Sequence, residues 1–172
     1  GIGRWGLMGS GNYYQQPSPA YMSAWSRYRL GYIDPFIIEN VTTAAPVDIL
    51  PAPIGGSEQT AMILPMDSNT PQEYLIIENR QKMGSDQHLN SSGLMVWHID
   101  ETMTDIYPAR NVNDNSNCYG VSHLGSGMTT LNNPYTYSYD RDADGDIEQG
   151  SGSNIKISNI VEDLAGVITL EI

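Results

Sequence analysis

Two unbroken apolar runs stand out in the hydrophobic pattern of the chain, at residues 74–77 (Tyr-Leu-Ile-Ile) and 94–97 (Leu-Met-Val-Trp). A strand with one solvated face alternates apolar and polar residues, whereas an unbroken run is typical of a strand covered on both faces. The pattern therefore predicts two central strands. Polar residues follow each run, at 78–80 and 98–101, so ionisable groups are expected where these strands end.

A helical pattern precedes the strands. Ser18 can cap a helix whose first position is Pro19, and Gly31 can end it. Between them, apolar residues recur at the spacing of one helical face, and Arg27 and Arg29 lie off that stripe. The pattern predicts an amphipathic helix packed on the sheet by one face, formed by Tyr21, Ala24, Trp25 and Tyr28.

Shorter apolar stretches at 36–41, 47–50 and 60–64 are divided by proline and glycine, which indicates a strand meander leading into the central strands. Near the end of the chain, apolar and polar residues alternate at 155–158 and again at 168–172. This alternation predicts a C-terminal β-hairpin with one buried face.

The predicted class is α+β and predominantly β, with an antiparallel or mixed sheet, one main helix near the N-terminus and the terminal hairpin. We expect a single domain over 1–172, divided into a glycine-rich loop and helix (1–31), a β core (32–101), a polar region (102–153) and the hairpin (154–172). The polar region has only weak strand signals, near 119–121 and 129–131. So long a stretch is expected to be functional or held by ions.

Composition narrows the function. The 172 residues include 20 acidic and 8 basic side chains, for a net charge of -12. Nucleic acid is therefore not expected as a partner, and divalent cations are the natural counter-charge. The single Cys118 excludes an internal disulfide framework, and no apolar run is long enough to span a membrane.

Two further features bear on processing. Sequons at Asn40 and Asn90 permit glycosylation in a secretory setting. The chain begins in a glycine-rich loop without an initiator methionine, so we expect that something N-terminal to it has been removed or is not included.

The most specific local motif is a run of alternating carboxylates interrupted by Gly145. The glycine permits a sharp turn, so the oxygens can converge on one hard cation. An EF-hand would need a glutamate where Ser151 stands, so we expect a calcium loop of another architecture, the alternative being a solvated acidic turn. The expected ligands are Asp140, Asp142, Asp144, Asp146 and Glu148.

The histidines do not form a zinc motif. None of the three lies in an H-E-x-x-H pattern. His98, beside Asp100, either lines a site or is a hydrogen-bonded structural histidine. A triad drawn from Ser92, His98 and Asp100 is discounted, because no G-x-S-x-G surrounds any serine.

Four stretches of the chain together suggest a family. They are residues 3–11 (Gly-Arg-Trp-Gly-Leu-Met-Gly-Ser-Gly), 19–27 followed by 30–32, 74–81 (Tyr-Leu-Ile-Ile-Glu-Asn-Arg-Gln) and 93–100 (Gly-Leu-Met-Val-Trp-His-Ile-Asp). The first looks like the Met-turn of the immune inhibitor A-like secreted zinc metallopeptidases, and the second is similar to the helix that follows it. The third and fourth match the two most recognisable downstream motifs of that family, in the same order.

The resemblance implies an extracellular protease whose zinc is held by an H-E-x-x-H helix upstream of the Met-turn. That helix is absent from this chain. The chain would then be the C-terminal part of a catalytic domain, inactive alone, with Met8 as the apolar floor under the zinc and Tyr13 or Tyr14 as a transition-state donor. Its partners would be the missing N-terminal part and a protein substrate, and zinc would belong to the parent protein.

A different class fits the same composition: a calcium-stabilised extracellular structural or adhesive module on a degenerate peptidase scaffold. Its 11 tyrosines and many Asn, Ser and Gly residues suit self-association or contact with glycans. An H-E-x-x-H upstream in the parent gene would favour the enzyme, and its absence there would favour the module.

Overall fold

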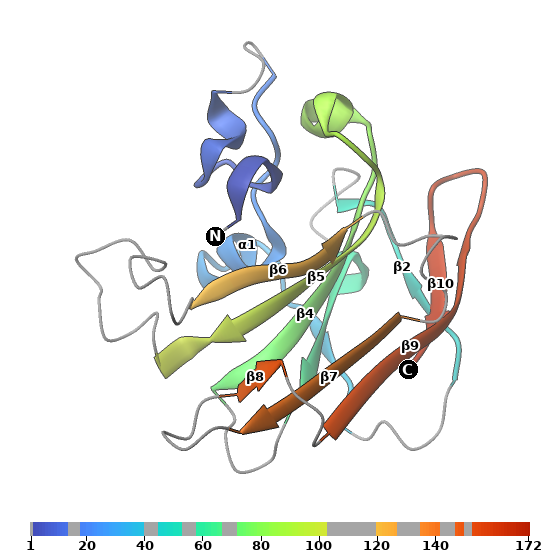
Figure 1. Ribbon diagram of the computed structural model, residues 1–172. Helices are drawn as coiled ribbons and strands as arrows, with labels where there is room; N and C mark the ends of the chain where they lie inside the picture. Colours follow the sequence, from blue (N-terminus) through green and yellow to red (C-terminus); the bar gives the residue numbers. More distant parts are fainter. Residues whose placement is uncertain are drawn as a thin grey trace.

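The computed structural model describes residues 2–13, 18–39, 45–52, 58–66, 72–102, 120–126, 135–141, 147–149 and 153–172. These residues form two five-stranded sheets, packed face to face, with one short α-helix on the outer face of the first sheet (Figure 1). The predicted class, α+β and predominantly β, is confirmed.

The first sheet contains both predicted central strands. Its order is β1-β3-β4-β5-β6; β1 and β3 run parallel and every other neighbouring pair is antiparallel. All eight residues of β4 and all eight of β5 are buried, as the unbroken apolar runs predicted. The strands are β1 Phe36–Ile37, β3 Ala61–Pro65, β4 Glu73–Arg80, β5 Gly93–Asp100 and β6 Val121–Ser126.

The second sheet has the order β2-β10-β9-β7-β8 and is antiparallel throughout. It includes the predicted terminal hairpin. The chain from 36 to 65 does not run as a meander within one sheet, because β2 pairs with β10 and buries Ile49 between the sheets. The strands are β2 Val47–Ile49, β7 Tyr135–Arg141, β8 Ile147–Gln149, β9 Ser153–Glu162 and β10 Ile168–Glu171.

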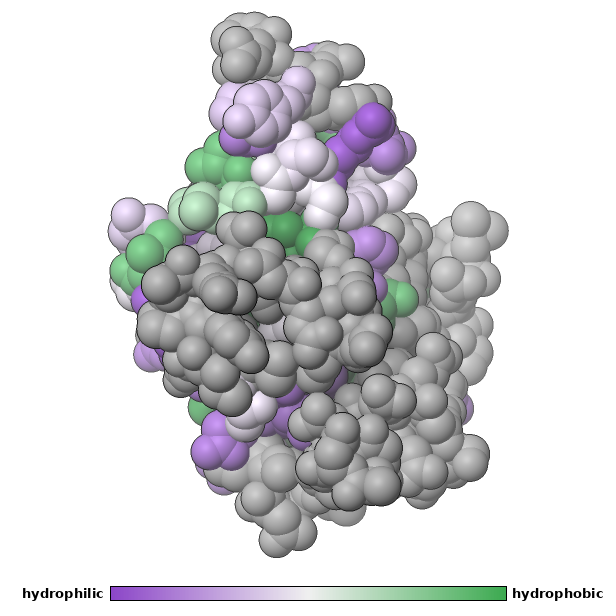
Figure 2. Space-filling model, turned by 60° about the vertical axis from the view of Figure 1, so that its left-hand side comes forward, coloured by the Kyte–Doolittle hydropathy of each residue, from purple (hydrophilic) through white to green (hydrophobic). Residues whose placement is uncertain are grey.

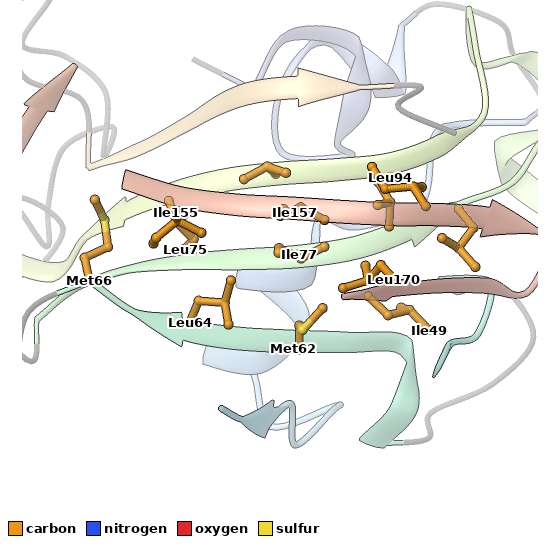
Figure 3. Packing of buried hydrophobic residues seen from close by; sticks show 13 residues of the cluster. Ile49, Met62, Leu64, Met66, Leu75, Ile77, Leu94, Ile155, Ile157 and Leu170 are labelled. Atoms are coloured by element: carbon orange, nitrogen blue, oxygen red, sulfur yellow. The ribbon is translucent and has the colours of Figure 1, made fainter. Parts of the chain in front are cut away.

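Alternation along β4 divides its side chains between two cores. Leu75 and Ile77 point into the inter-sheet core, whereas Tyr74 and Ile76 point toward the helix. Figure 3 shows the inter-sheet core, in which side chains of both sheets interdigitate. Its buried members are Ile49, Met62, Leu64, Met66, Leu75, Ile77, Leu94, Val96, Ile155, Ile157, Ile160, Ile168 and Leu170.

The helix α1, Ala24–Arg29, begins later than predicted. Its N-cap is Ser23, whose side chain accepts from the Ser26 amide, and Ser18 instead donates to the carbonyl of Ser85. The helix does not start earlier because side chains occupy the backbone of Tyr21: its amide donates to Asp86 and its carbonyl accepts from Arg80.

The end of α1 agrees with the prediction from Gly31. This glycine has φ +72°, its amide donates to Tyr28, and the amide of Tyr32 donates to the carbonyl of Arg27. These two bonds form a Schellman motif. Short 3-10 helices are η1 Gly3–Trp5, η2 Ser10–Asn12, η4 Glu58–Thr60 and η5 Gly84–His88. In the described part of the chain, no helix is long and apolar enough to cross a membrane.

Candidate functional site

The N-terminal segment, described at residues 2–13 and 18–22, lies on the helix side of the first sheet (Figure 1). Its centre is a turn closed by a 3.0 Å hydrogen bond from the amide of Gly9 to the carbonyl of Gly6. Met8 occupies this turn and its side chain is 72% exposed. Apolar residues also lie at the surface of the upper part of the molecule in Figure 2.

The glycines of this segment permit an unusually close approach of its backbone to itself. A Cβ on Gly9 would lie 2.3 Å from the carbonyl oxygen of Gly3, and one on Gly11 would lie 2.7 Å from that of Gly6. Neither oxygen belongs to a flexible side chain that could move aside. The turn that carries Met8 is therefore compact, and its shape depends on glycine at these positions.

Arg80, at the end of β4, connects this segment to the sheet. It is fully buried, and its Nη1 and Nη2 donate to the carbonyls of Trp5 at 2.8 Å and Tyr21 at 3.2 Å. The same guanidinium makes two 2.7 Å bonds to the carboxylate of Asp86, from Nε and Nη2. Asp86 in turn accepts from the Tyr21 amide.

Glu78, two residues earlier on the same face of β4, completes a buried ionic network. Its carboxylate accepts from Arg27 Nη2 at 2.9 Å, from Trp97 Nε1 at 2.8 Å and from Arg80 Nη1 at 3.3 Å. Arg27 is 2% exposed and also donates to Thr60. The network thus joins the N-terminal segment, α1, β4, β5 and η5.

The charges of the network balance, with two arginines (Arg27, Arg80) and two carboxylates (Glu78, Asp86). Burial by itself acts to lower the pKa of Arg80, but the neighbouring carboxylates of Glu78 and Asp86 outweigh it and raise the pKa above its ordinary value. Arg80 is therefore charged inside the fold. The sequence did not reveal this network, because Arg27 lies off the apolar helical stripe and would be expected in solvent.

His98 lies on the opposite face of the first sheet, facing the second sheet, beyond Val96. Its Nε2 has no hydrogen-bond partner among the described residues, and the nearest carboxylate oxygen, of Glu73, is 3.6 Å away. Ser92 precedes the start of β5, six residues from His98 and roughly 20 Å along an extended strand. The structure therefore does not assemble a Ser92, His98 and Asp100 triad.

The predicted calcium ligands fall only partly within the described residues. Asp140 on β7 and Glu148 on β8 are directly opposed partners in the antiparallel register. Asp142, Asp144 and Asp146 lie outside the described residues. Within the residues that are described, no three His, Cys, Asp or Glu side chains gather in an arrangement that could hold a metal ion.

The other predicted positions are distributed as follows. Asn90 is exposed, as a glycosylated asparagine would need to be, and Asn40 lies outside the described residues. Tyr13 is 79% exposed in the N-terminal segment, and Tyr14 lies outside the described residues.

A small hollow between the N-terminal segment and η5 is lined by Arg4, Trp5, Gly11, Ser18, Ala20, Ser85, His88, Leu89 and Asn90.

Comparison of the chain with known protein families, with curated proteins and with solved structures finds no match in any of the three. What the structure defines is a two-sheet sandwich with a glycine-rich segment held against one outer face. The function is inferred from that arrangement and from the motifs in the sequence.

Proposed function

We propose that this chain is the C-terminal part of a secreted zinc metallopeptidase-like catalytic domain and is not a complete catalyst by itself. The observation that carries the proposal is the state of Met8: its backbone lies in a compact turn anchored to the sheet, and its side chain is 72% exposed. The resemblance of residues 3–11 to a Met-turn gives that exposed thioether a role.

The energetics support presentation of this side chain to something outside the described residues. Burying a methionine is worth about 1.5–3 kcal/mol, which the exposed Met8 largely forgoes. The adjoining segment is nevertheless held through the charged, fully buried guanidinium of Arg80. A rigid turn with an apolar tip suits the floor of a cleft that another part of the polypeptide completes.

The zinc ligands and the general-base glutamate would come from an upstream H-E-x-x-H helix that the chain lacks. The histidines of the chain do not replace them. His88 is exposed on η5, His98 faces the second sheet, and His123 on β6 makes an edge contact with Trp97 on the helix side. Since a catalytic zinc commonly has three protein ligands, activity requires the upstream part.

The test is zinc-dependent cleavage of casein by two polypeptides, the 172-residue chain and the longer product of the parent open reading frame. We expect no cleavage by the chain alone, and cleavage by the longer product that a chelator abolishes and zinc restores. Zinc-dependent cleavage by the chain alone, or an inactive longer product, would overturn the proposal.

A second candidate, the calcium-stabilised structural module, is favoured by the register of β7 and β8. Asp140 and Glu148, two of the expected ligands, are partners in the antiparallel register, so the backbone brings both ends of the acidic run to one place. A cation bound near this hairpin is compatible with that register. Three further aspartates lie in the sequence between these two strands.

Thermal unfolding in calcium, magnesium or chelator tests this candidate, together with calorimetric titration. Calcium at a hundred times its dissociation constant should add about 2.7 kcal/mol to the free energy of unfolding, more than magnesium adds. Asp142→Ala and Asp144→Ala should each remove most of this gain, and Arg141→Ala should not. Equal melting temperatures in calcium and chelator, without titration heat, would reject calcium binding.

A further inference from the structure

The buried side chains of Arg80 and its partner Asp86 make hydrogen bonds to the N-terminal segment, and Ser18 adds two more at the edge of the segment, to the Ser85 carbonyl and from the Gln87 side chain. Arg80 donates to the carbonyls of Trp5 and Tyr21, and Asp86 accepts from the Tyr21 amide. Apolar contact is more limited: Ile2 and Trp5 are only partly buried where they pack on the helix-side core. The segment is thus held largely by polar contacts.

The geometry of Arg80 needs a guanidinium. Nε and Nη2 donate to the two oxygens of Asp86, which fixes the plane of the group, and Nη1 and Nη2 are then directed at Trp5 and Tyr21. A lysine ammonium has three donors on one atom and cannot reproduce two parallel bonds to a carboxylate together with bonds to two separate carbonyls.

We propose that Arg80, oriented by Asp86, is the positioning residue of the Met8-bearing segment. Its guanidinium fixes the segment to the sheet, and without it the segment detaches as a unit while both sheets remain folded. This role of Arg80 deepens the proposed function and rests on it for its purpose. Arg80, on the central strand β4, would set the position of Met8.

Detachment as a unit follows from where the hydrogen bonds lie. The segment has internal bonds of its own, from the amides of Gly9 and Gly11 to Gly6 and from Ala20 to Gly11. The β4 and β5 ladder pairs eight residues through backbone groups and does not use the Arg80 side chain. Such a division between local and global contacts is what produces separate opening of one region.

The neighbouring Asn79 provides a matched control. It is also fully buried on β4, but it points to the other face, where its Nδ2 donates to the carbonyls of Ile49 and Gly166 and so ties the two sheets together. Substitution at Asn79 should weaken the whole sandwich. Substitution at Arg80 should instead weaken the attachment of the N-terminal segment more than it weakens the contact between the two sheets.

The experiment is residue-resolved amide hydrogen exchange on the 172-residue chain as wild type, Arg80→Lys and Asn79→Ala. In Arg80→Lys, the amide of Tyr21, which donates across the contact to Asp86, should lose protection by at least about tenfold more than those of β4 and β5, since each charge-assisted bond lost is worth roughly a factor of ten or more. In Asn79→Ala, protection in β4 and β5 should fall by at least as large a factor as in the segment, because this variant weakens the contact between the two sheets.

Asp86→Asn is a second variant that leaves the guanidinium in place but weakens its orientation, and it should show the same selective loss in the segment. An equal loss of protection in segment and sheets, no loss in the segment, or global unfolding of both variants would overturn the inference. The assay needs no peptidase activity, so an inactive longer polypeptide would reject the proposed function and leave this result standing.

Discussion

Substitution of Glu78 by glutamine tests the buried ionic network directly. Glu78 is fully buried and accepts hydrogen bonds from Arg27, Arg80 and Trp97. Glutamine preserves the size of the side chain and one carbonyl oxygen but removes the negative charge. Among the four charged groups of the network, two positive charges would then face one carboxylate, that of Asp86.

The cost follows from the burial of the charge left behind. Arg27 is 2% exposed and cannot turn its guanidinium to water. Removing one partner of a buried ion pair typically costs about 3–5 kcal/mol. Natural domains are stable by only about 5–15 kcal/mol, so a large fraction of the total would be lost. For a chain of this size, the melting temperature should fall by roughly 6–20 °C.

The assay is urea unfolding of wild type, Glu78→Gln and the control Arg29→Gln. Arg29 lies on the same helix as Arg27, but its pair with Glu101 spans 3.4 Å and its side chain is 42% exposed. Such a surface pair is worth about 1 kcal/mol or less. If Glu78→Gln destabilised the protein no more than Arg29→Gln does, the network would not be a buried ionic one and our reasoning would fail.

Three further predictions concern the cores, the glycine turn and pH. Ile77→Ala should lower the free energy of unfolding by about 2–5 kcal/mol in urea. Ile37 is 55% exposed, so Ile37→Ala should change it by less than about 0.5 kcal/mol. Equal effects of the two substitutions would contradict the inter-sheet core. Gly11→Ala should lower hydrogen-exchange protection in the N-terminal segment, because its Cβ would meet the carbonyl oxygen of Gly6 at 2.7 Å, and unchanged protection would refute the close approach. Partial desolvation lowers the pKa of the His123 imidazole below its ordinary 6.5 in the folded protein. Between the folded and unfolded pKa values the unfolded chain binds more protons, so the free energy of unfolding falls as the pH drops from 6.5 toward the lower folded value. His123→Gln should therefore lose less stability than wild type between pH 7 and pH 5.5 in thermal unfolding, and an identical loss would contradict the assignment.

The parts of the fold that the sequence predicted are those set by local periodicity. The unbroken runs at 74–77 and 94–97 predicted strands covered on both faces, and β4 and β5 are buried along their whole length. Alternation near the C-terminus predicted the β9 and β10 hairpin. In each case the pattern of one segment reports how many of its own faces are covered, so no knowledge of its neighbours is needed.

The parts that the sequence did not predict depend on contacts between distant segments. Periodicity gives no sign that β2 joins a second sheet, since its partner β10 lies at the other end of the chain. The helix was expected to begin near Ser18, but Arg80 and Asp86 engage the backbone of Tyr21 and the cap falls at Ser23.

The candidate site was only partly predictable for the same reason. Met8 was singled out through resemblance, and its exposure is now known. The ionic network behind it was missed, because its charges are far apart in sequence and meet only in the fold. A signal did exist in the period of two along β4, which places Glu78 and Arg80 on the same face as the apolar Tyr74 and Ile76 that precede them.

The proposal that this chain completes a metallopeptidase fold with upstream zinc ligands is tested most directly by the sequence of the parent open reading frame before Gly1. We predict an H-E-x-x-H motif in that upstream region, in frame with the chain. An open reading frame that extends upstream without such a motif, or that starts at this chain, would contradict the claim and favour the calcium-stabilised module.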